Sequence, residues 1–240
     1  MKKIIYILFV FAVNIAFAQN VEFTKDNFKD KKDELKVALK NIEKGDKYRE
    51  QGIIYYKLAI EPYLEANKFN PNNALLNFKL GECYLVSNFK TKAIPFLEKA
   101  YSLNNEISPK IHYLLGRSYH LDMQLEKAIN EFKIYQQTVS SKDQEMLDVV
   151  EKEIDECNVG IQLLKNPVRV RITNVGGEIN SKYADFRPLI SADESVMIFT
   201  SRRPDGTGGD KIDQYSGEFF EDIYISTKKD GKWTPAVNMG

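Results

Sequence analysis

Two histidines are the only imidazoles of the chain, and their spacing decides whether they could share a metal ion. His112 and His120 lie eight residues apart in a segment with the apolar periodicity of a helix. At 1.5 Å per residue this separation is about 12 Å, which is too far for one ion without other ligands. We therefore predict two helix histidines with ordinary partners, no metal site and no cofactor.

The serines and cysteines show no pattern of nucleophilic catalysis. Neither a Gly-x-Ser-x-Gly elbow nor a cysteine–histidine signature is present. The glycines of GTGGDK, residues 206–211, are similar to those of a phosphate loop, but the Gly-Lys-Ser/Thr ending is missing. These observations predict a protein that is not an enzyme and has no catalytic residues.

The same stretch holds three aspartates, Asp205, Asp210 and Asp213, whose oxygens are of the type that calcium prefers. Their spacing is not that of an EF-hand loop. Two interpretations stay open at this point. One is a long solvated loop, which the composition favours, and the other is a calcium site.

Composition excludes one class of function. Lys plus Arg and Asp plus Glu each number 34 in the 240 residues, so the formal net charge is zero. Nucleic-acid-binding domains usually carry a basic excess, and we predict no nucleic-acid partner. The two cysteines, Cys83 and Cys157, lie in helical patterns with apolar neighbours, which favours buried thiols and leaves a disulfide as the alternative.

Residues 1–18 have the three parts of a secretory signal peptide. Lys2 and Lys3 precede an apolar run, and Ala16-Phe17-Ala18 forms a small-residue cleavage site. The apolar run is too short to span a bilayer stably. We predict export, with Gln19 as the first mature residue and no transmembrane segment in the mature chain.

The candidate residues must be positioned by two kinds of element. Residues 23–165 have the periodicity of helices, whereas residues 168–240 have the alternation and turn residues of strands. Asn166-Pro167 separates them, because proline ends helices and favours extended backbone before it. We predict an α + β multidomain chain with a boundary at this point.

An internal repeat organises the helical part. Five positions of one segment recur 35 residues later with matching residue types: Leu80 and Leu115, Gly81 and Gly116, Tyr84 and Tyr119, Ala93 and Ala128, Leu97 and Phe132. An earlier unit matches the second half of this pattern, since Ala59 precedes Ala93 by 34 residues. Small residues let helices approach closely, and such units bury their apolar faces by stacking.

This pattern resembles the tetratricopeptide repeat over residues 40–139, with a degenerate front half of the first unit near Lys47. The resemblance implies an α-solenoid with an inner groove that recognises an extended peptide or a partner helix. Its groove positions fall on Phe78, Glu82, Leu85, Tyr113, Arg117 and His120. The alternative is that Phe78 and Leu85 are core residues and that the polar groups are solvated.

Two further helices are expected to cover the ends of the array. Apolar residues recur at steps of three and four between Asp143 and Leu164, which predicts one amphipathic helix. A solenoid end exposes an apolar face, so we expect this helix to act as a cap. Residues 26–39 are the candidate cap at the other end.

Strands are expected from residue 168 onward. VRVRI, residues 168–172, alternates as a half-buried strand does, and RPLIS, VMIFTSRR, DIYIST and KWTPAV are the next candidates. Ala192-Asp193-Glu194 is expected to form one turn. Lys229-Asp230-Gly231 is expected to form a hairpin turn, because Asp-Gly accepts positive φ.

These strands resemble one repeat of the WD40-like, TolB-type β-propeller, over residues 173–240. The matching residues are Pro188, Ser191, Asp193, Glu194, Phe199, Thr200, Ser201, Arg202, Asp222, Ile223, Tyr224, Gly231, Trp233 and Pro235. The resemblance implies a single four-stranded antiparallel blade, whereas propellers need about four to eight. Because Asn238-Met239-Gly240 repeats Asn174-Val175-Gly176, we expect a chain truncated where a second blade would begin.

The order of a tetratricopeptide array followed by a WD40-like propeller resembles cell-envelope proteins of gliding Gram-negative bacteria. Fuller members of that family carry an OmpA-like peptidoglycan-binding domain, and some serve type IX secretion. The resemblance implies a non-enzymatic scaffold for envelope proteins, in the periplasm or at the outer membrane. It does not carry peptidoglycan binding to these residues. The alternative is the front part of an exported hydrolase or peptidase.

Overall fold

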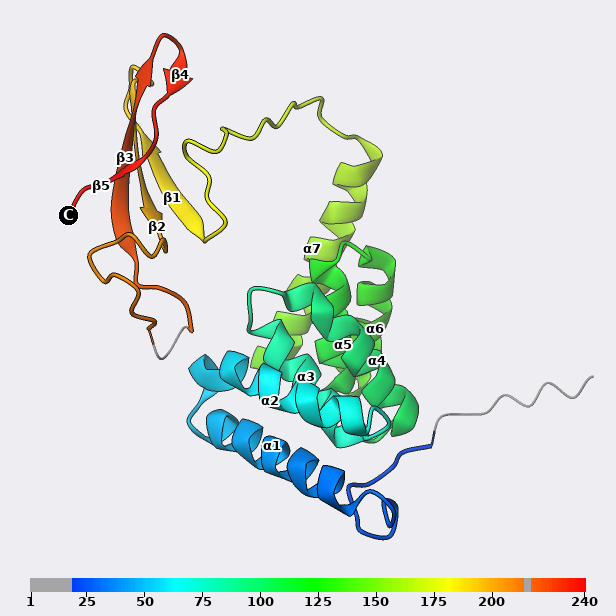
Figure 1. Ribbon diagram of the computed structural model, residues 1–240. Coiled ribbons are helices and arrows are strands. Elements are labelled where there is room, and N and C mark those ends of the chain that lie inside the picture. Colours follow the sequence, from blue (N-terminus) through cyan, green and yellow to red (C-terminus); the bar gives the residue numbers. More distant parts are fainter. Residues whose placement is uncertain (1–18, 214–216) are drawn as a thin grey trace, which may run out of the picture.

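The computed structural model describes residues 19–213 and 217–240, and the predicted signal peptide lies outside them. Helices occupy the first part of the chain and an antiparallel sheet occupies the last part (Figure 1). The α-helices are α1 (Lys32–Glu50), α2 (Tyr56–Phe69), α3 (Ala74–Leu85), α4 (Ala93–Leu103), α5 (Ile111–Leu121), α6 (Leu125–Thr138) and α7 (Gln144–Lys165). The coarse prediction of an α + β chain with helices before strands is confirmed.

Successive helices pack in pairs, α1 with α2, α3 with α4 and α5 with α6, and α7 packs on α6. The starts of two helices are set by capping side chains. Asn73 accepts a hydrogen bond from the backbone N–H of Leu76 at 2.9 Å, and Asp143 accepts one from Met146 at 3.2 Å. Both satisfy backbone donors that the first turn of a helix leaves free.

Each helix pair closes over a glycine. Gly45 faces Tyr63, Gly81 faces Leu97, and Gly116 faces Phe132. A Cβ at Gly116 would lie 2.6 Å from Phe132 Cδ1, and one at Gly81 would lie 2.4 Å from Leu97 Cδ2. These distances are too short for real carbon contacts, so the close approach of the helices requires glycine at these positions.

The helical core is one continuous cluster that runs from α1 to α7. Its fully buried large side chains include Tyr63, Leu80, Leu97, Phe132 and Val150. Because these residues come from successive helices, each pair buries its apolar face against its neighbours rather than alone.

The segment before α1 packs on the helical part through backbone and aromatic contacts. The backbone N–H of Val21 donates to Asn72 O at 2.7 Å, and the rings of Phe28 and Phe69 are 4.6 Å apart. The helix expected at residues 26–39 begins only at Lys32, because residues 25–30 form turns. That predicted boundary was wrong, while the helix itself extends further than expected, to Glu50.

The strand expected at residues 168–172 is absent from the structure, so this prediction was wrong. Residues 167–176 are extended without a strand partner, and Val168 and Ile172 are 80% and 91% exposed. Alternation of apolar and polar residues marks a strand only where another strand supplies hydrogen bonds, and none lies beside this segment among the described residues. The segment connects α7 to the sheet (Figure 1).

The sheet contains β1 (Asp185–Ile190), β2 (Val196–Ser201), β3 (Asp222–Lys229), β4 (Lys232–Trp233) and β5 (Val237–Asn238). All pairs are antiparallel, in the order β1-β2-β3-β4, and β5 also pairs with β3. The sheet is curled, and β1 is an edge strand whose register shifts between Phe186 and Leu189. Pro188 lies in that shift and Arg187 has a positive φ of 54°, which fits a bulge.

Both expected turns form. Asp230 and Gly231 have φ of 50° and 75° between β3 and β4, the backbone of a type I′ hairpin turn. The single last strand expected at KWTPAV is instead two short strands, β4 and β5. Thr234 still donates its backbone N–H to Thr227 O of β3 at 2.9 Å, so the pairing is interrupted at Pro235 and Ala236. Proline has no backbone N–H to donate, which explains the break.

The two faces of the sheet differ in coverage. On one face Met197, Phe199 and Tyr224 are buried with Ile179. On the other face four directly paired residues form what we call the apolar row: Leu189, Ile198, Ile225 and Val237. Leu189 and Val237 are 73% and 62% exposed, so this row lacks a cover in the described part of the chain.

No helix within residues 19–213 or 217–240 combines the length and apolar character needed to cross a bilayer.

The helical part and the sheet part of the chain are joined by a hydrogen bond, in which Asn88 Nδ2 donates to Glu218 Oε1 at 2.9 Å.

Candidate partner-binding surfaces

The predicted groove residues lie on α3 and α5, where side chains form ion pairs with the helices α1 and α7. Arg49 of α1 pairs with Glu82 of α3, and the Arg49 guanidinium lies 4.8 Å from the centre of the Tyr56 ring. Lys79 Nζ lies 2.5 Å from Asp46 Oδ1 in the same region. Burial raises the pKa of Glu82, while the neighbouring Arg49 opposes this effect. Glu82 is therefore held in a helix junction.

A second junction joins α5 to α7 through one buried carboxylate. Arg117 Nη1 donates to Glu153 Oε1 at 2.6 Å, and His120 Nδ1 donates to Glu153 Oε2 at 2.9 Å. Glu153 is buried, so its charge is stabilised by these two groups rather than by water. The structure brings together two predicted groove residues here and supplies the carboxylate that they share.

The aromatic groove candidates are packed against the core. The Tyr113 ring lies 6.0 Å from the Phe132 ring and 5.3 Å from the Tyr135 ring. Phe78 and Leu85 are likewise partly buried against the core cluster. These side chains support the array and leave only part of their surface for a ligand.

Sequence reasoning did not identify Arg49, Asp46 or Glu153 as members of these junctions. Each lies 33 to 36 residues from its partner and on a different helix. Only the repeat length contains a signal, because it places equivalent inner positions about one unit apart. The two histidines are also separated: His112 Nδ1 pairs with Glu131 Oε2 at 2.6 Å, away from Glu153.

Among residues 19–213 and 217–240, one group of side chains has potential metal-ligating atoms within 4.8 Å of one another. It consists of His120, Glu153 and Glu156. Two cations already neutralise the carboxylates. Arg117 contacts Glu153, and Lys152 Nζ lies 3.6 Å from Glu156 Oε1. Glu153 is thus paired across the junction of α5 and α7, and Glu156 is paired within α7.

The loop with three aspartates is anchored by contacts of its own. Tyr224 donates its hydroxyl hydrogen to Asp205 Oδ1 at 2.8 Å. Thr207 Oγ1 donates to Asp222 Oδ1 at 2.7 Å, and a Cβ at Gly206 would lie 2.2 Å from Asp222 Oδ2. Asp205 and Gly206 thus hold this end of the loop against β3.

Both cysteines are free, buried thiols. Burial raises the pKa of Cys83 to about 12 and that of Cys157 to about 11. Thiols of this kind react slowly because the thiolate is the nucleophile.

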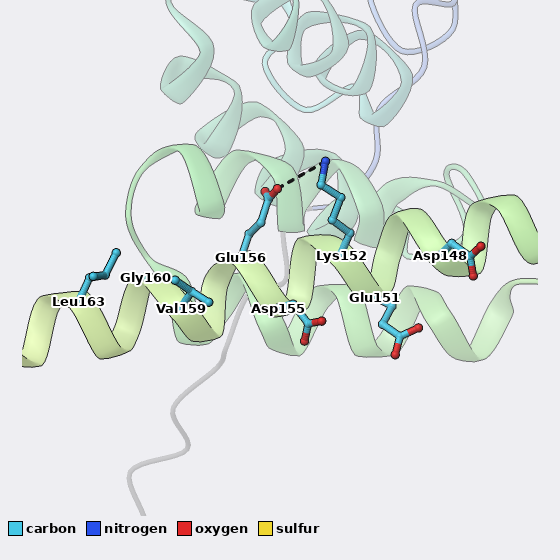
Figure 2. Close-up of a pocket in the computed structure, with 8 residues that line it drawn as sticks. All are labelled: Asp148, Glu151, Lys152, Asp155, Glu156, Val159, Gly160 and Leu163. Carbon is cyan, nitrogen blue, oxygen red and sulfur yellow. Dashed lines mark ion pairs between the residues drawn. The ribbon is translucent and has the colours of Figure 1, made fainter.

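A further surface lies on the exposed side of α7, and Gly160 at its edge packs towards Leu125 of α6. A shallow hollow of about 580 Å³ follows this helix (Figure 2). Its lining is Asp148, Glu151, Lys152, Asp155, Glu156, Val159, Gly160 and Leu163. Val159 and Leu163 are 59% and 67% exposed, so apolar and acidic groups share this surface, which we call the outer face of α7.

Comparison with known proteins shows no similarity: no protein-family model matches the sequence, and no curated protein matches it.

Proposed function

We propose that this chain is a non-enzymatic scaffold for protein–protein interaction, built from a tetratricopeptide solenoid and one blade of a WD40-like β-propeller. The observation that carries the proposal is the repeated contact between a glycine and a bulky residue in three successive helix pairs. Gly45, Gly81 and Gly116 follow one another at 36 and 35 residues, and each packs on the second helix of its pair. Stacked units of this kind serve to present an extended surface.

The inner surface of these units is the proposed partner site. Phe78, Glu82, Tyr113, Arg117 and His120 lie on α3 and α5, the first helices of the second and third pairs. Glu82 pairs with Arg49 of α1, and Arg117 and His120 pair with Glu153 of α7, so the helices are held in register. Such rigidity lowers the entropy cost of binding. A helix or an extended segment of a protein fits a groove with mixed aromatic and charged groups.

The apolar surface on both faces of the sheet supports the proposal of a propeller blade. The apolar row is exposed on one face. On the other, Pro188, Ile190, Met197 and Phe199 help to line a hollow of about 230 Å³. A sheet that packs between two similar sheets needs apolar groups on both sides, about 10 Å from each neighbour.

The predicted signal peptide supports a location in the periplasm or at the outer membrane. We propose that the scaffold belongs to a secretion, gliding or envelope-anchoring assembly, with envelope proteins as its partners. In this role Arg117 and His120 join α5 to α7 through Glu153 and also form part of the proposed partner site.

The proposal is tested by cross-linking an affinity-tagged chain to its neighbours in the envelope of the source cells. The double variant Tyr113→Ala with Arg117→Ala removes an aromatic and a basic group from the inner surface. Its matched control, Tyr101→Ala with Lys99→Ala, removes the same chemistry from α4. We expect the native chain and the control to retain a common partner and the inner-surface variant to lose it.

Thermal unfolding of both variants separates a loss of binding from a loss of fold, since Tyr113 also contacts the core. Retention of the partner by a folded inner-surface variant would show that the groove is not the site. A substrate turned over by the purified chain, and lost on changing one side chain, would contradict the scaffold itself.

A further inference from the structure

The outer face of α7 lies at the end of the helical array. In the first three pairs, each first helix is covered by the second helix of its own pair. α7 follows α6 without such a companion among the described residues, so one side of a helix of 22 residues is open. The length of this face from Asp148 to Leu163 is about 24 Å at 1.5 Å per residue.

Charge and apolar groups are ordered along this face (Figure 2). The carboxylates of Asp148, Glu151, Asp155 and Glu156 occupy its N-terminal part, with Lys152 as the one amine. Val159 and Leu163 follow towards the C-terminal end, one helical turn apart, and both are exposed. The face is therefore acidic at one end and apolar at the other.

We infer that the outer face of α7 docks a basic amphipathic helix of a partner protein, in the orientation antiparallel to α7. Lysines or arginines of that helix would face the four carboxylates, and two apolar side chains would cover Val159 and Leu163. Antiparallel docking places the basic residues in the C-terminal half of the partner helix, where its own dipole favours cations. Charge complementarity selects this occupant, because an acidic helix would be repelled.

A second copy of the chain is the main competing occupant. Two outer faces in contact would bring eight carboxylates together against two amines, and like charges across an interface disfavour association. The same argument favours a basic partner over self-association. The inference rests on the proposed function only in treating the helical part as a binding module, and it names a surface distinct from the inner groove.

The test uses the purified chain and two synthetic, fluorescein-labelled helical peptides of about 16 residues, matched to the length of the face. The first carries two leucines one turn apart in its N-terminal half and lysines in its C-terminal half. The second has glutamate in place of every lysine. Fluorescence anisotropy measures the affinity at low and high salt, and sedimentation velocity measures the mass of the chain alone.

Three double variants test the acidic part of the face, its apolar part and a control site separately. Glu151→Lys with Asp155→Lys reverses the acidic part, and Val159→Gln with Leu163→Gln removes the apolar part. Glu50→Lys with Glu106→Lys makes the same charge change at exposed sites away from α7. All six side chains are exposed, so the variants are expected to fold normally.

We expect the lysine peptide to bind the native chain and the charge control equally, and to bind the acidic-face reversal about tenfold more weakly. The apolar variant is expected to lose about fivefold, and binding is expected to weaken with salt. Equal binding of both peptides, an unchanged affinity of the reversal, or a dimer that the reversal dissociates would overturn the inference. If only the variant Tyr113→Ala with Arg117→Ala lost the peptide, the proposed function would stand without it.

Discussion

Arg117 of α5 and Glu153 of α7 are joined by a hydrogen bond of 2.6 Å that spans 36 residues of sequence. His120 donates to the other carboxylate oxygen of Glu153, so one buried acid receives two groups from the neighbouring helix. Arg117 and His120, which the repeat pattern predicts to line the groove, are thus part of the junction that holds α7 on the array. A partner that bound at the proposed groove would therefore also affect the stability of that junction.

The Glu153 junction should be measurable as stability. Glu153→Ala would leave Arg117 and His120 without their carboxylate, and we expect the free energy of unfolding to fall by about 2 kcal/mol. The control is Glu156→Ala on the same helix, which removes only an exposed pair and should cost about 0.5 kcal/mol or less. Urea unfolding followed by far-ultraviolet circular dichroism gives both values. Equal effects of the two substitutions would contradict the role of Glu153.

The close approach of α5 and α6 should make Gly116 intolerant of any side chain. Gly116→Ala places a Cβ against the ring of Phe132, and we expect a net loss of about 1 to 2 kcal/mol although alanine favours helix formation. Gly177→Ala is the control, because a Cβ there meets no atom within 4 Å. Thermal unfolding measures the difference. A more stable Gly116→Ala variant would show that the helices can separate at no cost.

The turn between β1 and β2 should weaken in acid. Ser191 Oγ and the backbone and hydroxyl groups of Ser195 donate to Asp193 Oδ1, and these hydrogen bonds hold the pKa of Asp193 at about 2. Because the folded pKa lies below the ordinary value of about 3.9, the contribution to stability is present above pH 4. It is lost as the pH falls through about 2.

Trp233 makes this effect measurable, since it is the only tryptophan and belongs to the sheet. Its fluorescence during urea unfolding at pH 5 and pH 2 should show a smaller acid effect in Asp193→Asn than in the native chain. Asp230→Asn, in the turn between β3 and β4, is the control. An unchanged pH dependence in Asp193→Asn would show that Asp193 contributes nothing to it.

The apolar row should bind apolar probes. Leu189→Lys with Val237→Lys removes its two exposed ends, and we expect the fluorescence of an apolar dye such as anilinonaphthalene sulfonate to fall roughly by half. Stability should change by about 0.5 kcal/mol or less, because both residues are exposed. Val37→Lys with Ile53→Lys makes the same change on exposed sites of the helical part. An equal fall of dye fluorescence in the control would show that the apolar row is not the main surface that binds the dye.

Local sequence signals predicted much of the helical part. Apolar residues that recur every three or four positions predicted a helix at 143–164, close to the observed bounds of α7. The repeat spacing identified Gly81 and Gly116. Gly45 was not identified, because it lies 36 residues before Gly81 in a unit whose front half departs from the pattern. The contacts of Glu153 were also beyond the sequence, since they depend on how two helices are rotated against each other.

The strand part shows a different limit. The turn at Asp230-Gly231 was predictable because positive φ restricts the residue types that can occupy it. The strand expected at residues 168–172 depends on a neighbour that periodicity does not describe. The break before β5 follows from Pro235, whose missing N–H carried the necessary signal.

The uncovered connection after α7 has a consequence for how the protein can be handled. Residues 167–172 are extended and exposed, and Arg169 and Arg171 lie within them, so trypsin should reach this segment before it reaches the packed helices. A brief digestion would then separate the helical piece from the sheet piece. Each piece could then be studied in isolation, and a protease that meets the protein in its own cell would reach the same segment first.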